Sequence, residues 1–205
     1  MKKIILVCIG FSLLSCISFK GVFAGKTTDN LKAAYKGEMT ASVKYTAYAE
    51  QARKEGLTQI ALLFTAVAKS ESIHAANHKM VLEKMGDKAP EFQPEFITKT
   101  TKENLQAAID GESAEINSMY PGYIGISRDE GTMDATKSMR WAMETEKKHL
   151  VLYRNALEAL NSNKVNTLPT LYWVCPKCCN TYNVPNPEAE CGFCGTKNTK
   201  FIKFV

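Results

Sequence analysis

A pattern that occurs twice in this 205-residue chain constrains its fold more than any other feature. The segment 30–38 (NLKAAYKGE) matches 104–112 (NLQAAIDGE), and 53–56 (RKEG) matches 128–131 (RDEG). The offset is 74 residues for the first pair and 75 for the second. Such a duplication predicts two equivalent halves that pack against each other around a pseudo-two-fold axis.

Each half has the sequence of two long helices. Between Asp29 and Asn161 the chain is rich in the helix formers Ala, Glu, Lys, Leu and Met. The link 86–97 between the halves contains Pro90 and Pro94, which exclude a continuous helix there. Helices are predicted at 29–54, 57–85, 102–127 and 132–161. Short, long and short links between such helices are typical of the ferritin-like bundle, so the predicted fold class is an all-α four-helix bundle with one crossover.

The change of offset places one extra residue in the third helix, between Glu112 and Arg128. A single inserted residue within a helix is usually absorbed as a π-bulge, and such bulges are frequent at functional sites. Tyr45 matches Tyr120 only if the insertion precedes Tyr120. Pro121 follows directly and would also distort this turn.

Glutamate and histidine three residues apart lie on one face of a helix. One such pair is weak evidence, because charged pairs are common on solvated faces. Here the pair occurs in both the second and the fourth helix, and the first and third each supply a glutamate at matching repeat positions. This is the ligand set of dinuclear carboxylate bundles, whose oxygen and nitrogen donors suit iron or manganese. The predicted ligands are Glu38, Glu71, His74, Glu112, Glu146 and His149.

Two further residues near these ligands break the repeat. Glu115 lies three residues after Glu112, so it also faces the centre, and its counterpart in the first half is Ala41. We interpret it as a seventh ligand that makes the two metals unequal, with a surface glutamate as the alternative. His78, one turn after the predicted ligand in the second helix, has Tyr153 as its counterpart. We interpret His78 as a surface or packing residue.

The far end of the chain carries two Cys-x-x-Cys pairs, Cys175 with Cys178 and Cys191 with Cys194. Two such pairs make a tetrahedral four-thiolate site, which fits either zinc or a single iron. Trp173, just before the first pair, and the attachment to a bundle with its own metal site favour iron.

The residue that follows each pair differs. In the rubredoxin-like modules that these pairs resemble, a glycine usually follows each pair, because the chain turns back there with positive φ. Here Gly195 follows the second pair, but Cys179 follows the first. A residue other than glycine at positive φ costs roughly 1 kcal/mol. Cys179 is therefore either a tolerated substitute or a spare thiol that exchanges disulfides or competes as a ligand.

The first 24 residues have the layout of a secretory signal peptide. Lys2 and Lys3 precede the apolar run 4–19, which is shorter than the roughly 20 residues needed to span a membrane, and 22–24 (VFA) offers small residues for cleavage. A lipoprotein signal with an acylated Cys16 is the alternative. Export to the periplasm is predicted, with membrane attachment only if Cys16 is lipidated.

Without the signal peptide the chain keeps 23 basic and 21 acidic residues, a net charge of +2 that is too small to indicate a nucleic-acid partner. The predicted organisation is a signal peptide (1–24), a ferritin-like bundle (25–161), a polar linker (162–169) and a four-cysteine domain (170–205). We call the last of these the cysteine module.

Taken in order, these motifs resemble the rubrerythrin family over nearly all of the mature chain. The resemblance is carried by Gly37-Glu38 with Tyr45, Glu71-x-x-His74-Ala75, Gly111-Glu112-x-x-Glu115 with Met119-Tyr120-Pro121, Glu146-x-x-His149 and the four cysteines. It implies two non-haem irons in the bundle and a third in a rubredoxin-like site. The use of Cys191-Gly192 in place of the family's more usual Cys-Pro is a departure.

The resemblance also implies roles for individual residues. Glu71 and Glu146 would bridge the metals and Glu38 and Glu112 would be terminal ligands. His149 would hold one iron permanently. The other iron would move between Glu115 when oxidised and His74 when reduced, and Tyr45 and Tyr120 would bond ligand carboxylates. These implied roles are stated for Glu38, Tyr45, Glu71, His74, Glu112, Glu115, Tyr120, Glu146 and His149.

The implied activity is reduction of hydrogen peroxide, with electrons arriving through the cysteine module from an unidentified donor. In the family that module reaches the di-iron site of a partner subunit in a head-to-tail dimer, so a homodimer is expected. The alternatives are an iron-handling ferroxidase and a non-catalytic binding protein with a zinc ribbon.

Overall fold

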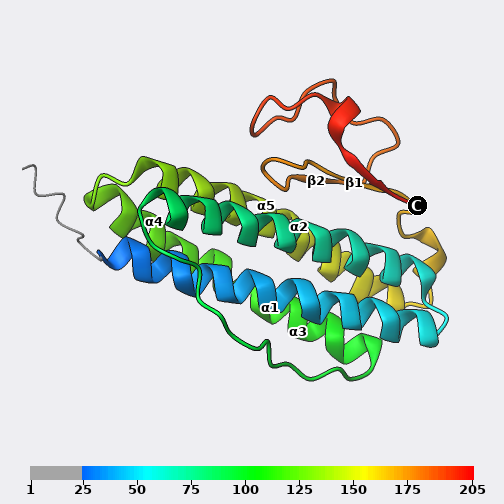
Figure 1. Cartoon of the computed structure of the whole chain (residues 1–205). Helices are drawn as coiled ribbons and strands as arrows, with labels where there is room; N and C mark the ends of the chain where they lie inside the picture. The colour runs from blue at the N-terminus through cyan, green and yellow to red at the C-terminus, as the bar shows by residue number, and fades with distance from the viewer. Residues whose placement is uncertain (1–24) are drawn as a thin grey trace, which may run out of the picture.

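The computed structural model describes residues 25–205 and is dominated by long helices (Figure 1). The predicted signal peptide and Cys16 lie outside the described residues. The helical elements of the bundle are α1 (Lys26–Lys54), α2 (Thr58–Lys84), α3 (Thr101–Ala114), the π-helix η1 (Glu115–Met119), α4 (Tyr120–Asp129) and α5 (Met133–Asn161). The predicted helix positions and the long crossover are therefore confirmed within a few residues.

The predicted π-bulge is also confirmed. The five-residue π-helix η1 directly precedes Tyr120 and joins α3 to α4 in one continuous rod. Pro121 lies in the first turn of α4, where its missing N–H disturbs no α-helical hydrogen bond. The extra residue thus leaves the two sides of the rod in register with the repeat.

The pseudo-two-fold relation is visible in how the halves cap each other. The Glu55 carboxylate accepts hydrogen bonds from the Thr101 backbone N–H at the start of α3. Glu130, its repeat counterpart, accepts from the N–H groups of Lys26 and Thr27 at the start of α1, both at 3.0 Å. A carboxylate at a helix N-terminus satisfies unpaired N–H groups and complements the helix dipole. Each half therefore stabilises the first turn of the other.

Two apolar clusters fill the bundle, and the predicted metal ligands lie between them along the helices. One cluster includes Tyr45, Phe64 and Tyr153, and the other includes Leu31 and Met139. No helix within residues 25–205 is long and apolar enough to cross a membrane.

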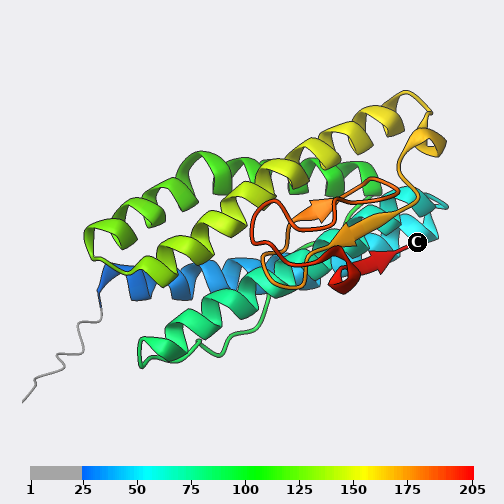
Figure 2. The ribbon, with the colours of Figure 1, turned by 90° about the horizontal axis from the view of Figure 1, so that it is seen from above.

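The cysteine module contains a small antiparallel sheet in the order β2-β1-β3, formed by β1 (Tyr172–Val174), β2 (Thr181–Tyr182) and β3 (Ile202–Phe204). Short 3-10 helices at Val165–Thr167 and Asn198–Lys200 precede the module and its last strand. The module lies over α2 and α5, as seen from two directions (Figures 1 and 2).

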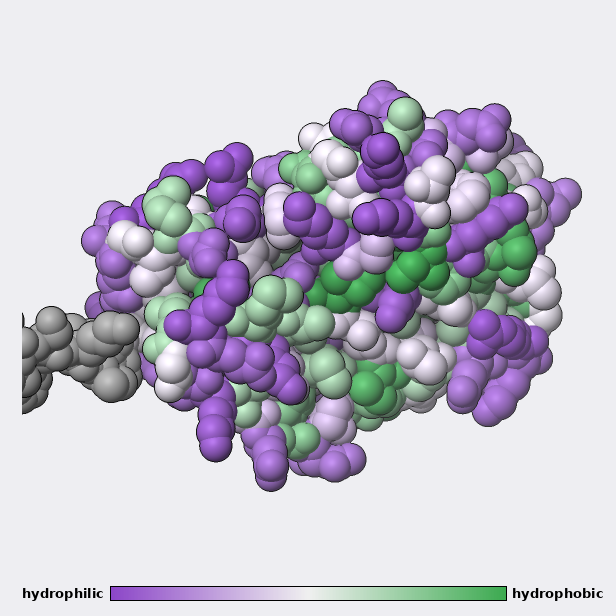
Figure 3. All heavy atoms as spheres, turned by 45° about the horizontal axis from the view of Figure 1, so that its top comes forward, coloured by the Kyte–Doolittle hydropathy of each residue, from purple (hydrophilic) through white to green (hydrophobic). Residues whose placement is uncertain are grey.

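The contact between module and bundle is part of the protein core. Tyr172, Val174 and Cys179 belong to the same buried cluster as the aromatic residues of the bundle. On the face shown in Figure 3, hydrophilic residues predominate and hydrophobic residues gather mainly across the middle of the view. The module is therefore packed against the helices of its own chain.

Candidate metal centres

All six predicted bundle ligands converge in the interior, one from each of α1 and α3 and two from each of α2 and α5. Each has at most 2 % of its surface exposed. The residues are Glu38, Glu71, His74, Glu112, Glu146 and His149. Burial of four carboxyl groups in one place would be strongly unfavourable without cations to pair with them.

The two histidines present the same nitrogen to the carboxylates. His74 Nδ1 lies 2.8 Å from Glu71 Oε2, 2.7 Å from Glu146 Oε1 and 3.4 Å from Glu38 Oε2. His149 Nδ1 lies 2.7 Å from Glu146 Oε2 and 3.1 Å from Glu71 Oε1. Glu71 and Glu146 therefore each contact both histidines with different oxygens, which is the position of a bridging carboxylate.

Two overlapping groups of four have ligand atoms that all lie within 4.8 Å of one another. They are Glu38, Glu71, His74 and Glu146, and Glu71, Glu112, Glu146 and His149. The shared pair is again Glu71 and Glu146. This arrangement could hold two metal ions side by side.

Unpaired oxygen atoms give an independent test of that reading. One buried carboxylate oxygen from each of Glu38, Glu71, Glu112 and Glu146 makes no aligned hydrogen bond, although three of these atoms lie 2.7, 3.1 and 3.4 Å from a histidine Nδ1. A buried polar atom without a partner is costly, and the charge-neutralising partner that suits four such oxygens is a pair of divalent cations. The donor set therefore fits the dinuclear site that the sequence predicted.

Glu115 is not part of either close group. It is half-buried at the first residue of η1. Burial raises the pKa of its carboxyl group, and the nearby charges of Glu38 and Glu146 raise it further, while His74 lowers it. Glu115 therefore lies near the carboxylates of the site and His74 but not among the closest donors.

In the absence of metal, burial and the close approach of carboxyl and imidazole groups shift the pKa values of these ligands. Burial raises the pKa of Glu38 to about 8. Burial also opposes the charged form of His149, but the carboxylates of Glu71 and Glu146 outweigh it and raise the pKa of His149 to about 9. The pKa of Glu71 is lowered, because the adjacent histidines outweigh the effect of burial. Bound metals would take the place of the protons that hold these groups together.

The tyrosines bond across the two halves. The Tyr45 hydroxyl of α1 donates to Glu112 Oε1 of α3 at 2.9 Å. Its repeat counterpart, Tyr120 of α4, donates to Glu38 Oε1 of α1. Both hydroxyls therefore bond terminal carboxylates, and partners of this kind orient metal ligands.

His78 is a buried residue outside both close donor groups, so the packing interpretation is confirmed and the surface alternative was wrong. Its side chain is fully buried between α2, α4 and α5. Nε2 lies 3.1 Å from the Tyr120 hydroxyl and Nδ1 lies 2.9 Å from Ser138 Oγ. Ser138 lies too far away in sequence to be recognised as the partner of His78.

The cysteine module covers the outer side of both ligand histidines. Thr181 Oγ1 lies 3.0 Å from His149 Nε2. Cys179 lies beside His74, whose pKa is lowered by burial but raised more by the Cys179 sulfur and the surrounding carboxylates. Sequence reasoning missed both contacts, because nothing in the module's sequence indicates where it packs.

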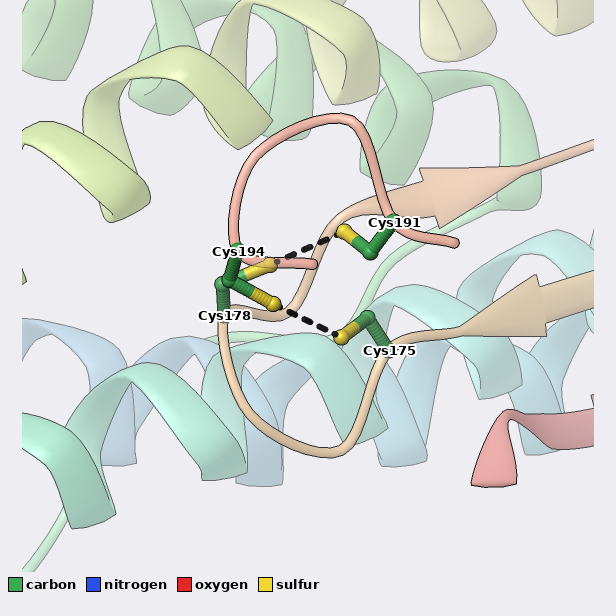
Figure 4. Close-up of side chains that lie close together, drawn as sticks. All are labelled: Cys175, Cys178, Cys191 and Cys194. Atoms are coloured by element: carbon green, nitrogen blue, oxygen red, sulfur yellow. Dashed lines mark hydrogen bonds between the residues drawn. The ribbon is translucent and has the colours of Figure 1, made fainter. Parts of the chain in front are cut away.

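The four predicted cysteines form the second candidate centre (Figure 4). The Sγ atoms of Cys175 and Cys194 are 3.6 Å apart, and those of Cys178 and Cys191 are 3.3 Å apart. A tetrahedral ion with bonds of about 2.3 Å requires sulfur–sulfur edges of about 3.8 Å. The four thiols therefore stand nearly as a bound ion would hold them, with Cys179 outside the set.

The backbone confirms that the chain turns with positive φ after both cysteine pairs, although only the second pair is followed by glycine. Cys179 has φ 71° and Gly195 has φ 68°, so both residues occupy the left-handed region. Lys148 of α5 extends over this module, with Nζ 5.0 Å from the Tyr182 ring and 4.8 Å from the Phe193 ring. Its positive charge lies close to the thiolates of Cys178 and Cys191.

Comparison with known proteins agrees with this construction. The family model described as rubrerythrin matches residues 29–157. The chain belongs to the rubrerythrin family. This family comprises di-iron proteins involved in oxidative stress defence, and membership indicates an oxidoreductase.

Individual relatives cover almost the whole chain. Rubrerythrin-2 of Clostridium acetobutylicum is 37 % identical over 179 residues, which are 87 % of this chain and 96 % of the relative. Nigerythrin of Nitratidesulfovibrio vulgaris is 31 % identical over 75 % of this chain and 82 % of its own. The solved structure of fully reduced, all-ferrous nigerythrin superposes with a TM-score of 0.77 at 29 % identity and covers 91 % of both chains. The ferritin-like fold with its rubredoxin-like module is therefore confirmed.

Proposed function

We propose that this chain is a peroxidase that reduces hydrogen peroxide to water in the bundle, with electrons supplied through the cysteine module. The reaction breaks the O–O bond and consumes two electrons and two protons for each peroxide. One observation carries the proposal. A buried carboxylate–histidine site and a four-thiolate site occur in one chain, and the loop after Cys178 contacts His149 of the first site through Thr181.

The ligand assignment that we propose follows the geometry. Glu71 and Glu146 would bridge the two ions, Glu38 and Glu112 would be terminal ligands, and His74 and His149 would bind through Nδ1. Two irons held by these residues would supply the two electrons by passing from the ferrous to the ferric state. The thiolates of Cys175, Cys178, Cys191 and Cys194 hold the third iron.

The surrounding residues hold these ligands in place. Tyr45 and Tyr120 each fix one terminal carboxylate by a donated hydrogen bond, and Thr181 fixes the ring of His149. Glu115 supplies an additional carboxylate on the Glu38 side, and we propose that it alternates with His74 as a ligand when the oxidation state changes. Exchange between Glu115 and His74, with the other ligands fixed, would let the site accommodate both the oxidised and the reduced state.

The route of electrons is short within one chain. The peptide that follows Cys178 leads directly to Cys179 beside His74, and two residues later to Thr181 on His149. Electrons from the four-thiolate iron would therefore enter the bundle at its two histidines. The homodimer is a separate proposal, which sedimentation at several concentrations tests.

Rapid mixing tests the activity. The anaerobically reduced, iron-loaded protein is mixed with hydrogen peroxide, and the ferric absorbance of the bundle site is followed against a parallel mixing with O₂. We expect oxidation by peroxide to be at least tenfold faster. Equal rates, or faster oxidation by O₂ with uptake of more than three irons per chain, would instead support the iron-handling alternative.

A pair of variants tests the role of Glu115. Glu115→Ala should retain two metals in the bundle but change the absorbance of the oxidised site and slow peroxide turnover. Glu50→Ala, an exposed glutamate of α1, is the matched control and should change neither. Unchanged spectra and turnover in Glu115→Ala would contradict the proposed ligand exchange. A colourless protein that contains only zinc would exclude the catalytic proposal altogether.

Export is proposed from the sequence of residues 1–24 alone. Cleavage after Ala24 would leave Gly25 as the first residue, directly before α1 begins at Lys26. The bundle would then be complete in the mature chain. The intact mass of the protein recovered from cells distinguishes this product from a chain that begins with a lipid-modified Cys16.

A further inference from the structure

A chain of buried hydrogen bonds reaches one carboxylate of the bundle site from the side. Ser138 Oγ of α5 lies 2.9 Å from His78 Nδ1 of α2, and His78 Nε2 lies 3.1 Å from the Tyr120 hydroxyl of α4. Tyr120 in turn bonds Glu38 of α1. His78 is 0 % exposed and Ser138 is 5 % exposed. The chain therefore joins four helices at one terminal ligand.

The Glu38 carboxylate at the end of this chain of hydrogen bonds determines which group is the donor in each bond. A metal-binding carboxylate only accepts hydrogen bonds, so Tyr120 donates to Glu38. The single hydroxyl hydrogen is then used, and the Tyr120 oxygen must accept from His78 Nε2–H. Burial lowers the pKa of His78 to about 3, helped by the nearby His74, so the imidazole is neutral and its Nδ1 accepts from Ser138.

The other half of the bundle has no equivalent chain. The repeat counterparts of His78 and Ser138 are Tyr153 and Leu63. The buried Tyr153 hydroxyl has no partner among residues 25–205. Tyr45, the counterpart of Tyr120, meets aromatic rings instead, with its centroid 5.4 Å from Tyr153. Tyr45 therefore bonds the Glu112 carboxylate without a second hydrogen bond of the kind that His78 provides to Tyr120.

We infer that His78, supported by Ser138, is a positioning residue that locks Tyr120 onto Glu38 and thereby makes the two metal positions unequal. Tyr120 cannot turn its hydrogen away from Glu38 without losing two hydrogen bonds, whereas Tyr45 would lose one. Glu38 and His74 belong to the same group of close donors, the position at which Glu115 is proposed to alternate with His74. The lock thus keeps one ligand stationary where the other ligands are proposed to exchange.

Titration of the metal-free protein with cobalt(II) tests this inference. Cobalt bound by thiolates absorbs in separate charge-transfer bands, so the bundle sites can be followed independently of the cysteine module. His78→Phe should weaken one of the two bundle sites about tenfold, in the range typical for loss of a group that orients a metal ligand, and leave the other unchanged. Ser138→Ala should weaken the same site about threefold.

Two further variants separate positioning from packing. His78→Gln retains an N–H donor for Tyr120 and should restore most of the affinity. Tyr153→Phe removes a buried hydroxyl that has no partner at the equivalent position, and should leave both sites at wild-type affinity. In the zinc-loaded protein, nitrogen-15 NMR should find His78 as the Nε2–H tautomer.

The outcomes distinguish this inference from the ligand assignment on which it rests. If the wild-type bundle binds fewer than two cobalt ions, the proposed assignment fails. If it binds two and His78→Phe binds them equally well, or if His78 is the Nδ1–H tautomer, the positioning role is overturned. Should His78→Phe fold poorly, the tautomer in the zinc-loaded wild-type protein decides alone.

Discussion

In the bundle, the ligands stand on long helices that pack through two apolar clusters, whereas in the cysteine module they stand on two loops beside strands of two or three residues. The bundle therefore has a core that does not depend on its metals. The only core of the module beyond its contact with the helices is a cluster that consists largely of the cysteines themselves. In the bundle, metal binding should relieve the unfavourable burial of the carboxyl groups. In the cysteine module, metal binding should supply most of the free energy of folding.

The largest expected effect is loss of the metal in the cysteine module. Cys191→Ser should abolish tight binding and unfold residues 170–205, because binding of a structural metal contributes on the order of 10 kcal/mol to such small folds. Helical circular dichroism should change little. Limited proteolysis followed by mass spectrometry locates the cleavage. Cys179→Ala is the control, and equal protease resistance of the two variants would contradict the comparison.

The bundle should respond in the opposite sense when a ligand is neutralised. Burial raises the pKa of Glu112 well above its usual value, so its charged form destabilises the metal-free fold. Glu112→Gln should stabilise the metal-free protein by about 1–3 kcal/mol at pH 8 while weakening two-metal binding. Urea unfolding with a chelator measures the first effect. A less stable Glu112→Gln protein would show that the buried carboxylates do not destabilise the metal-free bundle.

The pH dependence of stability should also distinguish the bundle from the cysteine module. Glu38 has a folded pKa of about 8, above its unfolded value, so it favours the folded state less as the pH rises from about 4.5 to 8. His149 has a folded pKa of about 9, so its stabilisation is complete below about 6.5 and lost by about 9. Both changes have the same sign. The melting temperature of the metal-free bundle should therefore fall between pH 5 and 9, and bound metal should flatten this dependence.

Lys148 tests whether the helices tune the thiolate site. Its positive charge favours the more negatively charged reduced form of an iron–thiolate site. Lys148→Met should lower the reduction potential of that iron by on the order of 20–50 mV, since the side chain is only half-buried and solvent screens part of its charge. Redox titration of the visible absorbance measures this. Lys147→Met, which faces solvent, is the control.

The smallest effect is expected at the positive-φ residue of the first loop. Cys179→Gly should relieve about 1 kcal/mol of backbone strain but lose a buried sulfur worth a similar amount, so stability should change little. Gly195→Ala introduces strain without added burial and should destabilise the module by about 1 kcal/mol. Thermal unfolding of the two metal-loaded variants compares them. A large loss in Cys179→Gly would assign the thiol a role in holding the module on the bundle.

Much of the fold and of the candidate site could be predicted because both repeat. The matching of Tyr45 with Tyr120 located the π-helix to within a few residues, and the paired Glu-x-x-His motifs identified the residues that converge. The contacts of His78 with Ser138 could not be predicted, because they belong to one half only and depend on how helices meet in space. For the same reason the packing of Thr181 on His149 was not visible in the sequence.

The placement of residues 179–181 against the bundle gives the four-thiolate site an inner and an outer pole. Cys178 belongs to the inner pole, next to the loop that covers the histidines. Cys194 is the only one of the four cysteines that is not fully buried, and it belongs to the outer pole. A reductant too large to enter the protein would therefore meet the site at Cys194. In the proposed function, electrons would enter at the exposed Cys194 end of the site and leave at the buried Cys178 end, with their direction set by the redox potentials of the two metal sites.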